Sequence, residues 1–196
     1  MTGQREVVEM RKNFRDFAAF FPQPVLVIGT YDENGVPNAM NVGWGGMSGA
    51  RYVNINISRG HKTTDNIMRK QAFTMSFADE AHLVEADYFG LATGRTENKL
   101  EKAGMRAVKS AFVDAPVIEA FPLTLECRVE ELREIRGHVE IIGEIVNMSA
   151  DESVLDENGQ VDADLLHALS YDRVKRVYRK LGGVVGNAYS DGKKLL

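Results

Sequence analysis

Apolar and polar residues alternate at every second position in several segments, which is the pattern of a β-strand with one buried face. In residues 51–58, Val53, Ile55 and Ile57 fall on one face, and Asn54 and Asn56 fall on the other. Alternation or β-branched runs predict further strands at 25–31, 36–42, 72–77, 121–135 and 138–147. Strands therefore account for most of the expected regular structure.

Turn residues connect these strands in a way that favours antiparallel pairing. Asn34-Gly35 separates the first two strands, and Arg136-Gly137 separates the last two. An Asn-Gly pair is the strongest short-range signal of a β-hairpin, because both residues tolerate a positive φ. We therefore expect hairpins at both places.

Short helices are expected before and between the strands. They cover residues 5–20, ended by Pro22 and Pro24, then 63–70 with a threonine cap, 79–90 and 97–103. Residues 151–164 predict an acidic loop, and 165–181 form a last apolar-spaced stretch. Few helices around many strands predict a mainly β (α+β) fold with a closed or nearly closed antiparallel sheet. Residues 1–196 contain no repeat, low-complexity tract or clear linker, which favours a single domain.

Charge argues against a nucleic-acid partner, and hydropathy argues against a membrane partner. The chain has 24 basic and 28 acidic residues, a net charge of −4 and a pI near 5.6. Binding to a nucleic acid through its phosphates needs concentrated Lys and Arg, which neither half of the chain supplies. No run approaches the roughly 18 apolar residues of a membrane span, and residues 1–10 lack the apolar core of a signal peptide. We therefore expect a cytoplasmic protein that binds no nucleic acid and no membrane.

Side chains that commonly carry catalysis are scarce. Cys127 is the only cysteine and falls on the apolar face of an alternating strand, so we expect a packed, inert thiol. The four histidines show no metal-ligand spacing, and no metal site is predicted. The glycine cluster at 43–49 lacks the third glycine of a dinucleotide fingerprint, and neither a Walker A sequence nor a nucleophile elbow is present. Enzymes with so few such groups usually take their chemistry from an organic cofactor.

The first segment that could hold a cofactor runs from Asn38 to Ser48. It combines a strand end, a glycine-rich bend and the only tryptophan, Trp44. Glycines let backbone N–H groups approach a ligand, and Met40, Trp44 and Met47 could form an apolar wall beside a flavin ring. The alternative is a barrel corner, with glycine for the bend and tryptophan for the core.

Two further segments place cations and hydroxyls before a helix. Residues 58–64 contain Arg59, Lys62, Thr63 and Thr64 at a strand exit. Because a helix N-terminus has unpaired N–H groups and a positive dipole end, this segment could bind a phosphate. The alternative is an ordinary capped helix with a solvated basic loop. Residues 93–99 give a weaker signal of the same type, which an ordinary loop tip would also explain.

Taken together, these segments resemble the flavin reductase-like family of FMN-binding split barrels, and most closely its flavoredoxin branch. The resemblance spans about residues 22–193, and its motifs occur in the family's order. These motifs are 24–32, 35–40, 44–46, 66–68, 86–90, Gly94-Arg95 with Lys99, 114–116, 121–127, 143–145, 181–182 and 186–189.

The resemblance implies an antiparallel split β-barrel with a few peripheral helices that binds FMN non-covalently. It places one group of residues around the isoalloxazine ring, a second around the phosphate and a third where the pocket closes. The first group is Asn38, Ala39, Met40, Asn41, Val42 and Trp44, with Met47 and Ser48 close by; the second is Arg59, Lys62, Thr63 and Thr64; the third is Gly94, Arg95 and Lys99. It also implies a homodimer with flavin sites near the subunit interface.

Two departures from the flavoredoxin branch affect individual contacts. Residues 46–51 replace a segment that commonly carries prolines, and Asn98 replaces an aspartate usual before Lys99. The expected function is an oxidoreductase that passes electrons from NAD(P)H through FMN to an acceptor. The alternatives are an electron carrier reduced by a partner redox protein and a non-catalytic ligand-binding barrel. No catalytic side chain is predicted.

Overall fold

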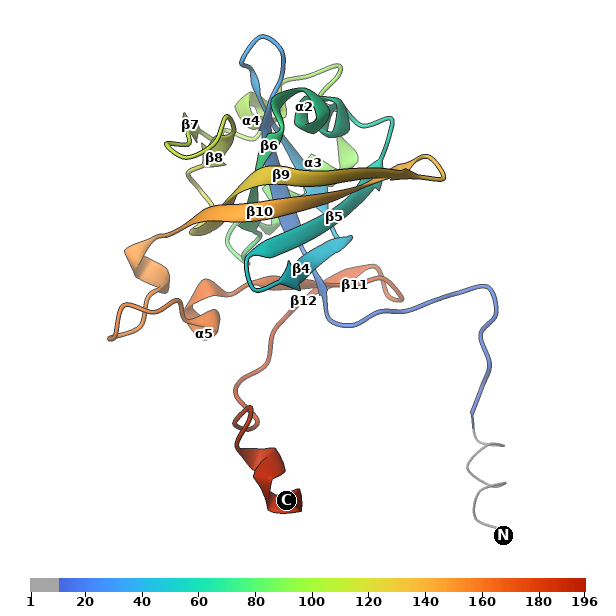
Figure 1. The fold of residues 1–196 in the computed structure, drawn as a ribbon, viewed down its shortest axis with the longest axis vertical. Helices are drawn as coiled ribbons and strands as arrows, with labels where there is room; N and C mark the ends of the chain where they lie inside the picture. The colour runs from blue at the N-terminus through green and yellow to red at the C-terminus, as the bar shows by residue number, and fades with distance from the viewer. Residues whose placement is uncertain (1–10) are drawn as a thin grey trace.

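The structure, a computed structural model, describes residues 11–196, and its main feature is a curved seven-stranded antiparallel sheet (Figure 1). The strand order in this sheet is β3-β2-β6-β9-β10-β5-β4. The strands are β2 (Leu26–Tyr31), β3 (Pro37–Val42), β4 (Gly45–Gly49), β5 (Tyr52–Ser58), β6 (Ala72–Phe77), β9 (Leu123–Ile135) and β10 (His138–Ala150). Each predicted strand is present in it, with ends that differ by a few residues.

The two edge strands of this sheet, β3 and β4, follow one another in the chain and are separated only by Gly43 and Trp44. They do not pair with each other, so the barrel stays open along a seam at this place. The backbone N–H of Asn56 on β5 donates to the carbonyl of Trp44 at 2.8 Å, which ties the connection to the opposite side of the seam. This is the predicted split β-barrel.

The inner face of the sheet encloses the main core. Leu26, Ile55, Phe73, Leu125 and Ile141 come from five different strands and pack into one buried cluster. Such contacts between strands far apart in the sheet require it to curl, because a flat sheet would separate them. At about 25 cal/mol per Å² of apolar area, burial of this kind is the largest favourable contribution to the stability of the fold.

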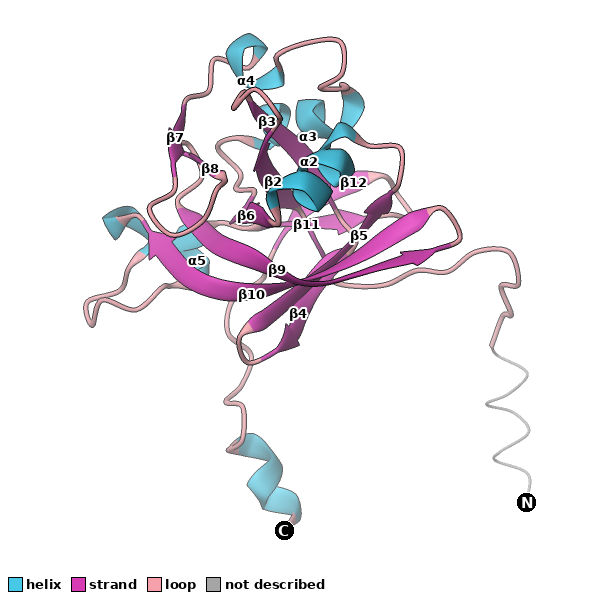
Figure 2. Cartoon of the chain, turned by 45° about the horizontal axis from the view of Figure 1, so that its top comes forward, coloured by secondary structure: helices cyan, strands magenta, loops and turns pink. Residues whose placement is uncertain are grey.

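The outer face of β2 and β3 is covered by helices and loops (Figure 2). Val27 and Ala39 pack there against Phe89 of α3 and Leu100 of α4. The helices are α2 (Lys62–Lys70), α3 (Leu83–Leu91), α4 (Lys99–Lys102) and α5 (Ala163–Leu166), with 3-10 turns η1 (Glu152–Val154) and η2 (Asp191–Leu195). Figure 1 shows α2, α3 and α4 gathered at one end of the barrel.

Two small sheets complete the fold. A three-stranded sheet contains β1 (Gln23–Pro24), β11 (Leu169–Asp172) and β12 (Val177–Lys180) in the order β1-β11-β12. A two-stranded sheet pairs β7 (Ala107–Lys109) with β8 (Pro116–Ile118). The first of these joins the start of the barrel to a segment about 150 positions later, with Gln23 opposite Tyr171.

Several local predictions were wrong. The helix expected at 5–20 is absent from its described part, residues 11–20, which are exposed and without regular structure; the rest lies outside the described residues. No threonine caps α2, because the helix starts at Lys62 and His61 occupies the cap position without a side-chain hydrogen bond. The expected loop at 151–164 holds the η1 turn and the start of α5, and the expected helix at 79–90 begins only at Leu83.

The predictions for the two hairpin turns and for the packed thiol of Cys127 are confirmed. Gly35 has a φ of 77°, and Arg136 and Gly137 have φ of 50° and 80°, as tight hairpin turns require. Cys127 is fully buried in the main core, and burial raises the pKa of its thiol to about 12. Within residues 11–196, no helix is long and apolar enough to cross a membrane, and no group of side chains has the composition of a metal site.

Candidate cofactor site

A cavity of about 290 Å³ lies between β3, the start of α2 and the end of α3. It is closed by the loop that connects α3 to α4. Eight of the fifteen residues predicted for the site line it, namely Asn38, Met40, Asn41, Lys62, Thr63, Gly94, Arg95 and Lys99. Segments that are far apart in the sequence therefore meet around one space.

Two asparagines of β3 are held in fixed orientations at the cavity. The side-chain amide of Asn38 donates to the hydroxyl oxygen of Thr63 at 3.0 Å, and this pair is buried. The amide of Asn41 donates to the carbonyl of Ala86 on α3 at 2.8 Å. Because one N–H of each amide is bonded to a protein partner, the two asparagine oxygens keep defined positions.

The N-terminus of α2 supplies unused hydrogen-bond donors. The backbone N–H groups of Lys62 and Thr63 have no acceptor among residues 11–196, as expected for the first residues of a helix. The Thr63 oxygen accepts from Asn38, which leaves its O–H proton free to donate into the cavity. The Thr64 hydroxyl is not free, since it donates to the carbonyl of Ser58 at 2.6 Å.

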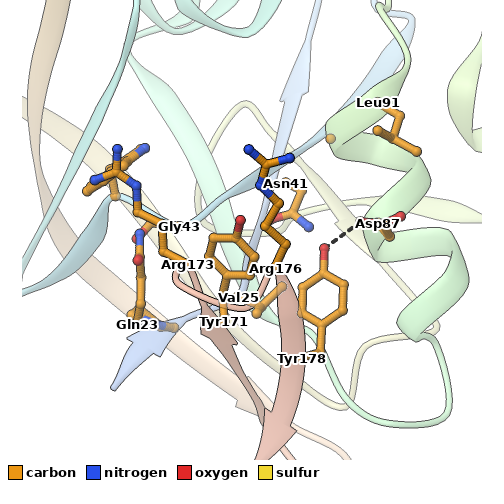
Figure 3. A pocket seen from close by; sticks show the side chains of 13 residues that line it. Gln23, Val25, Asn41, Gly43, Asp87, Leu91, Tyr171, Arg173, Arg176 and Tyr178 are labelled. Carbon is orange, nitrogen blue, oxygen red and sulfur yellow. Dashed lines mark hydrogen bonds between the residues drawn. The ribbon is translucent and has the colours of Figure 1, made fainter. Parts of the chain in front are cut away.

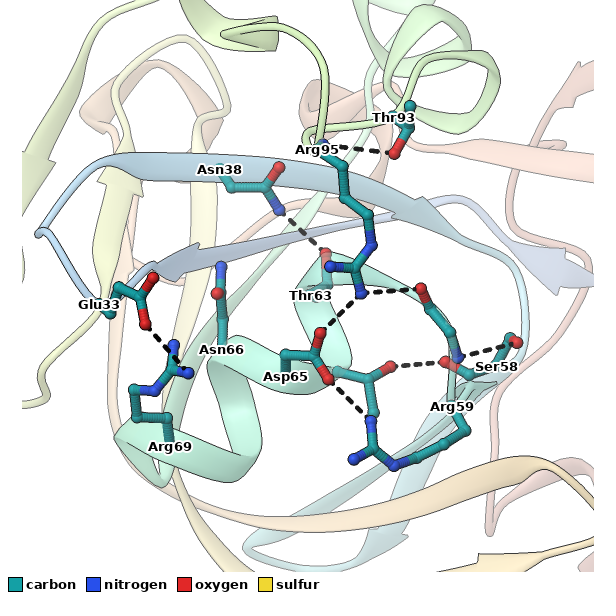
Figure 4. Close-up of polar contacts among 12 residues, drawn as sticks. Glu33, Asn38, Ser58, Arg59, Thr63, Asp65, Asn66, Arg69, Thr93 and Arg95 are labelled. Carbon is teal, nitrogen blue, oxygen red and sulfur yellow. Dashed lines mark hydrogen bonds and ion pairs between the residues drawn. The ribbon is translucent and has the colours of Figure 1, made fainter.

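Basic side chains surround this helix end, and Asp65 organises two of them (Figure 4). Its carboxylate accepts from Arg95 at 2.6 Å and from Arg59 at 2.7 Å, and these contacts hold the pKa of Asp65 below its usual range. Arg95 also donates to the carbonyl of Gly60 at 3.0 Å and lines the cavity, whereas Arg59 does not. Lys62 lines the cavity as well and pairs with Asp32 at 3.0 Å.

Lys99 is the most unusual cation of the site. Its side chain is only 4% exposed, and its ammonium donates to the carbonyls of Phe89 at 3.0 Å and Ala92 at 3.3 Å. These carbonyls belong to the C-terminal end of α3, where the helix dipole favours a cation. Burial, opposed by Glu97 and assisted by Lys62, lowers the pKa of Lys99 to about 8. Its ammonium can donate one more hydrogen bond, so an anion in the cavity would stabilise its charged form.

His61 and Gly94 complete this end of the site. Burial, together with the charges of Lys99 and Arg95, lowers the pKa of His61. Gly94 packs so closely against β3 that an added Cβ would collide with the side-chain oxygen of Asn38. Any other residue here would displace Asn38, which explains why the closing loop carries a glycine at this point.

Trp44 marks the other end of the site, at the seam of the barrel. Its side chain is 54% exposed, and it borders a small cavity together with Asn56 and His138. An exposed tryptophan beside unoccupied space offers a flat apolar surface for a ring system. Both the glycine-rich bend and the N-terminus of α2 border β3, so a single elongated ligand could contact both.

The remaining predicted residues lie elsewhere. Ala39 and Val42 are buried in the two cores, so only their backbone could meet a ligand. Met47 and Ser48 are exposed on the edge strand β4, and Met47 lines a different groove. Their contact with a cofactor stays a prediction, as it does for the residues that line the cavity.

The chemistry of this lining fits a phosphorylated ligand. Two free backbone N–H groups, a free hydroxyl and the cations Lys62, Arg95 and Lys99 all converge on one cavity. Convergent N–H groups at a helix N-terminus and nearby cations are how proteins bind phosphate groups. Sequence reasoning missed Gly60 and His61 as lining residues, although both lie within the segment it singled out at 58–64.

Solved structures share this fold, and other proteins are similar in sequence. Flavoredoxin of Desulfovibrio vulgaris (Miyazaki F) is 29% identical and superposes with a TM-score of 0.89 over 93% of this chain and 100% of its own. Flavoredoxin from Methanosarcina acetivorans is 25% identical, with a TM-score of 0.87 over 95% of this chain and 99% of its own. An uncharacterized protein of Halalkalibacterium halodurans is 25% identical over 174 residues, which cover 82% of this chain and 83% of that protein.

The profile of the family described as "Flavin reductase like domain" matches residues 18–179. This match includes every strand of the barrel and all of the cavity described above. The chain therefore belongs to the flavin reductase-like domain family.

Proposed function

We propose that this protein binds FMN non-covalently and passes electrons from NAD(P)H through it to an acceptor. The main support for the proposal is the cavity at the N-terminus of α2, where free N–H groups and three cations converge beside β3. A strand rises about 3.3 Å per residue, so Asn38 and Val42 lie about 13 Å apart. This span can separate a phosphate at Asn38 from a ring at Trp44.

We place the phosphate at the N-terminus of α2, which we call the phosphate end of the site, and the residues there contribute to binding in two ways. The N–H groups of Lys62 and Thr63 and the Thr63 hydroxyl supply directional hydrogen bonds, while Lys62 and Lys99 supply positive charge. At the ring end, the backbone of residues 41–44 supplies polar groups, and Trp44 supplies an apolar surface. FMN itself provides the redox chemistry, and the protein provides orientation and electrostatics.

A pair of lysines on α2 gives a matched test of FMN binding. Lys62 and Lys70 each pair with an aspartate at 3.0 Å, but only Lys62 lines the cavity. We expect Lys62→Gln to raise the Kd for FMN about tenfold or more, because it removes a charge-assisted contact. Lys70→Gln should leave the Kd unchanged. Equal effects of the two variants would contradict binding of the phosphate at this place.

Direct reduction by a nicotinamide tests the electron donor. NADH or NADPH, mixed anaerobically with the FMN-loaded protein, should bleach the flavin absorption band at about 450 nm. A dedicated Rossmann domain is not required, because a nicotinamide can dock transiently in an open cleft beside FMN. An unbleached band with both nucleotides would refute NAD(P)H as the donor.

The similarity to two flavoredoxins favours a second candidate function. In this function the protein keeps its FMN and is reduced by a partner redox protein. Bleaching by a reduced partner protein, without bleaching by NADH or NADPH, would support it. A third candidate, a barrel that binds another small ligand, would be supported if the protein took up no FMN.

We also expect a homodimer in the cytoplasm. Met47, Tyr52 and Met148 are large exposed apolar residues, and Met47 and Met148 line a groove of about 580 Å³. Exposed apolar patches of this kind mark interaction surfaces. Light scattering coupled to gel filtration would give twice the chain mass of 21.8 kDa if the proposal is right.

A further inference from the structure

A smaller cavity, of about 260 Å³, adjoins the phosphate end of the candidate site. It shares Lys62 and Arg95 with the cavity at the N-terminus of α2, so the two spaces are neighbours. All seven described residues that line it are polar or charged, and we call it the polar cavity. A ligand that continues past a phosphate held by Lys62 and Arg95 would therefore meet this lining.

The cations of the polar cavity are already paired with carboxylates. Each of its three basic side chains forms an ion pair with one of its three acidic side chains: Lys62 with Asp32 at 3.0 Å, Arg95 with Asp65 at 2.6 Å and Arg69 with Glu33 at 3.2 Å. Figure 4 shows the pairs of Arg95 and Arg69 as dashed lines. The charges of this lining cancel, so an anion that entered it would have to compete with carboxylates for every cation.

The cavity at the N-terminus of α2 has a different charge balance. Its lining contains the cations Lys62, Arg95 and Lys99, and none of its described residues is acidic. A phosphate monoester carries a charge of about −1.5 to −2 at neutral pH, which this lining can balance. The balance changes at Lys62 and Arg95, because the carboxylates begin on their other side. The two cavities together therefore provide for one phosphate group and not for two.

The carboxylates of the polar cavity are fixed and ionised. The side chain of Asp32 is only 13% exposed, and one of its oxygens accepts from the backbone N–H groups of Asn34 and Val36, each at 2.9 Å. Burial raises the pKa of Asp32, but the hydrogen bonds from Val36, Lys62 and Asn34 outweigh burial and hold this pKa below its usual range. Two arginines have the same effect on Asp65. Both side chains therefore keep their negative charge at neutral pH.

In a flavin dinucleotide, a second phosphate follows the first after a single bridging oxygen. With the first phosphate at the N-terminus of α2, the second would lie close to Asp32 and Asp65. Like charges in a partly buried space repel one another strongly, and proteins use such repulsion to reject a competing ligand. We propose that Asp32 and Asp65 make this site selective for a flavin that ends in one phosphate, and that they exclude FAD. This inference rests on the proposed function, because it takes the flavin phosphate to lie at the N-terminus of α2.

The two ion pairs that α2 makes through lysine and aspartate provide matched variants. Asp32→Asn removes the charge but keeps a side-chain oxygen that can accept from Asn34 and Val36, so the turn should be preserved. Asp114→Asn is the control. Asp114 pairs with Lys70 at the same distance of 3.0 Å, but it lines neither cavity.

Calorimetry on the full-length chain gives the Kd for FMN and for FAD. We expect the unmodified protein to bind FAD about a hundredfold more weakly than FMN, because like charges that are brought together cost several kcal/mol. Asp32→Asn should lower the ratio of the two Kd values about tenfold, mainly by strengthening the binding of FAD. Asp114→Asn should leave the ratio unchanged.

Salt separates charge repulsion from a simple lack of space for the adenosine of FAD. The Debye length falls from about 10 Å at 0.1 M salt to about 3 Å at 1 M salt. In the unmodified protein, the ratio of the Kd for FAD to the Kd for FMN should therefore fall about threefold or more over this range. A steric barrier would give a ratio that does not depend on salt. This measurement needs no variant.

Two results would overturn the inference. One is equal affinity for FMN and FAD, and the other is a ratio that changes neither with salt nor in Asp32→Asn. Riboflavin, which lacks the phosphate, distinguishes these results from a failure of the proposed function. If riboflavin binds as tightly as FMN, or if no flavin binds, the proposed function is refuted. If riboflavin binds more weakly than FMN while FAD equals FMN, only the present inference is refuted.

Discussion

Replacement of Lys99 by methionine is the sharpest single perturbation of the phosphate end of the site. The methionine keeps most of the volume and apolar character of the lysine stem but removes the buried ammonium. Lys99 lines the cavity together with Lys62, Thr63 and Gly94, and its ammonium has one donor left after its bonds to Phe89 and Ala92. We expect Lys99→Met to weaken FMN binding strongly.

The size of the effect follows from the pKa of Lys99. Burial lowers this pKa from 10.5 to about 8, which corresponds to a cost of about 3 kcal/mol for holding the charge in the free protein. A phosphate group that pairs with the ammonium would return most of this cost on binding. The variant should therefore raise the Kd for FMN by about a hundredfold.

The same reasoning predicts a pH dependence of FMN binding. Above a pH of about 8, Lys99 of the free protein loses its proton, whereas bound phosphate favours the charged form. Binding then requires uptake of a proton, so the Kd should rise by up to about tenfold per pH unit above that point. The Kd for Lys99→Met should not show this rise.

Quenching of FMN fluorescence, measured from about pH 6.5 to about pH 9.5 so that both protonation states of Lys99 are sampled, provides the assay. Lys102→Met is the control, because Lys102 lies on the same helix but is exposed and pairs with Glu97 at 2.8 Å. A Kd for Lys99→Met within about twofold of the unmodified protein, or a pH profile that it leaves unchanged, would refute the reasoning. Circular dichroism should show both variants folded. Lys99→Met loses two hydrogen bonds to helix carbonyls, but it also removes the free-energy cost of a buried charge. The two effects on the free energy of unfolding offset each other.

Other predictions test individual parts of the structure. Gly94→Ala should raise the Kd for FMN about tenfold or more, because its Cβ would collide with the side-chain oxygen of Asn38; an unchanged Kd in FMN titration would contradict the close packing. Thr63→Val should raise the Kd for FMN about tenfold by removing a free hydroxyl donor. Thr64→Val, whose hydroxyl is already bonded to the backbone, should instead lower the free energy of unfolding in urea by about 1 kcal/mol and leave the Kd unchanged. Cys127 is fully buried with a pKa of about 12, so a thiol reagent at about pH 8 should label it only after unfolding; rapid labelling of the native protein would disprove its place in the core.

The barrel strands could be predicted from the sequence because their signals are local. The alternation in residues 51–58 and the Asn34-Gly35 turn each specify structure within a few positions. The hairpin of β9 and β10 follows the same logic, with Arg136 and Gly137 both at positive φ. The helix expected at 5–20 does not form in its described part, residues 11–20. There Phe14, Phe17 and Phe20 have no core to pack against and stay exposed. Without a packed face, a short helix is only marginally stable in water.

Part of the candidate site was also predictable. A predicted helix N-terminus with cations and threonines indicated a phosphate site, and Lys62 and Thr63 do line a cavity there. The sequence could not decide which hydroxyl is free or which arginine faces the cavity. Thr64 bonds to the backbone, and Arg59 turns to Asp65 outside the cavity. These choices depend on side-chain partners that only the folded chain defines.

A cavity of about 440 Å³ between Trp44, α3 and the hairpin of β11 and β12 (Figure 3) had only a weak signal in the sequence. Gln23 and Tyr171 meet through the pairing of β1 with β11, across about 150 positions of chain. Strands of two and four residues carry too weak a pattern to reveal such a pairing. The acidic turn residue Asp172, followed by Arg173 and Arg176, was the one available local signal, since aspartate often caps a turn.

The central claim is that this chain binds FMN without a covalent bond, and a visible absorption spectrum during FMN titration tests it most directly. The purified protein should show, or acquire on addition of FMN, a flavin band at about 450 nm that saturates at one FMN per chain. Denaturation should then release the flavin into solution. A colourless protein that takes up no added FMN would contradict the claim, and so would a flavin that stays attached to the unfolded chain.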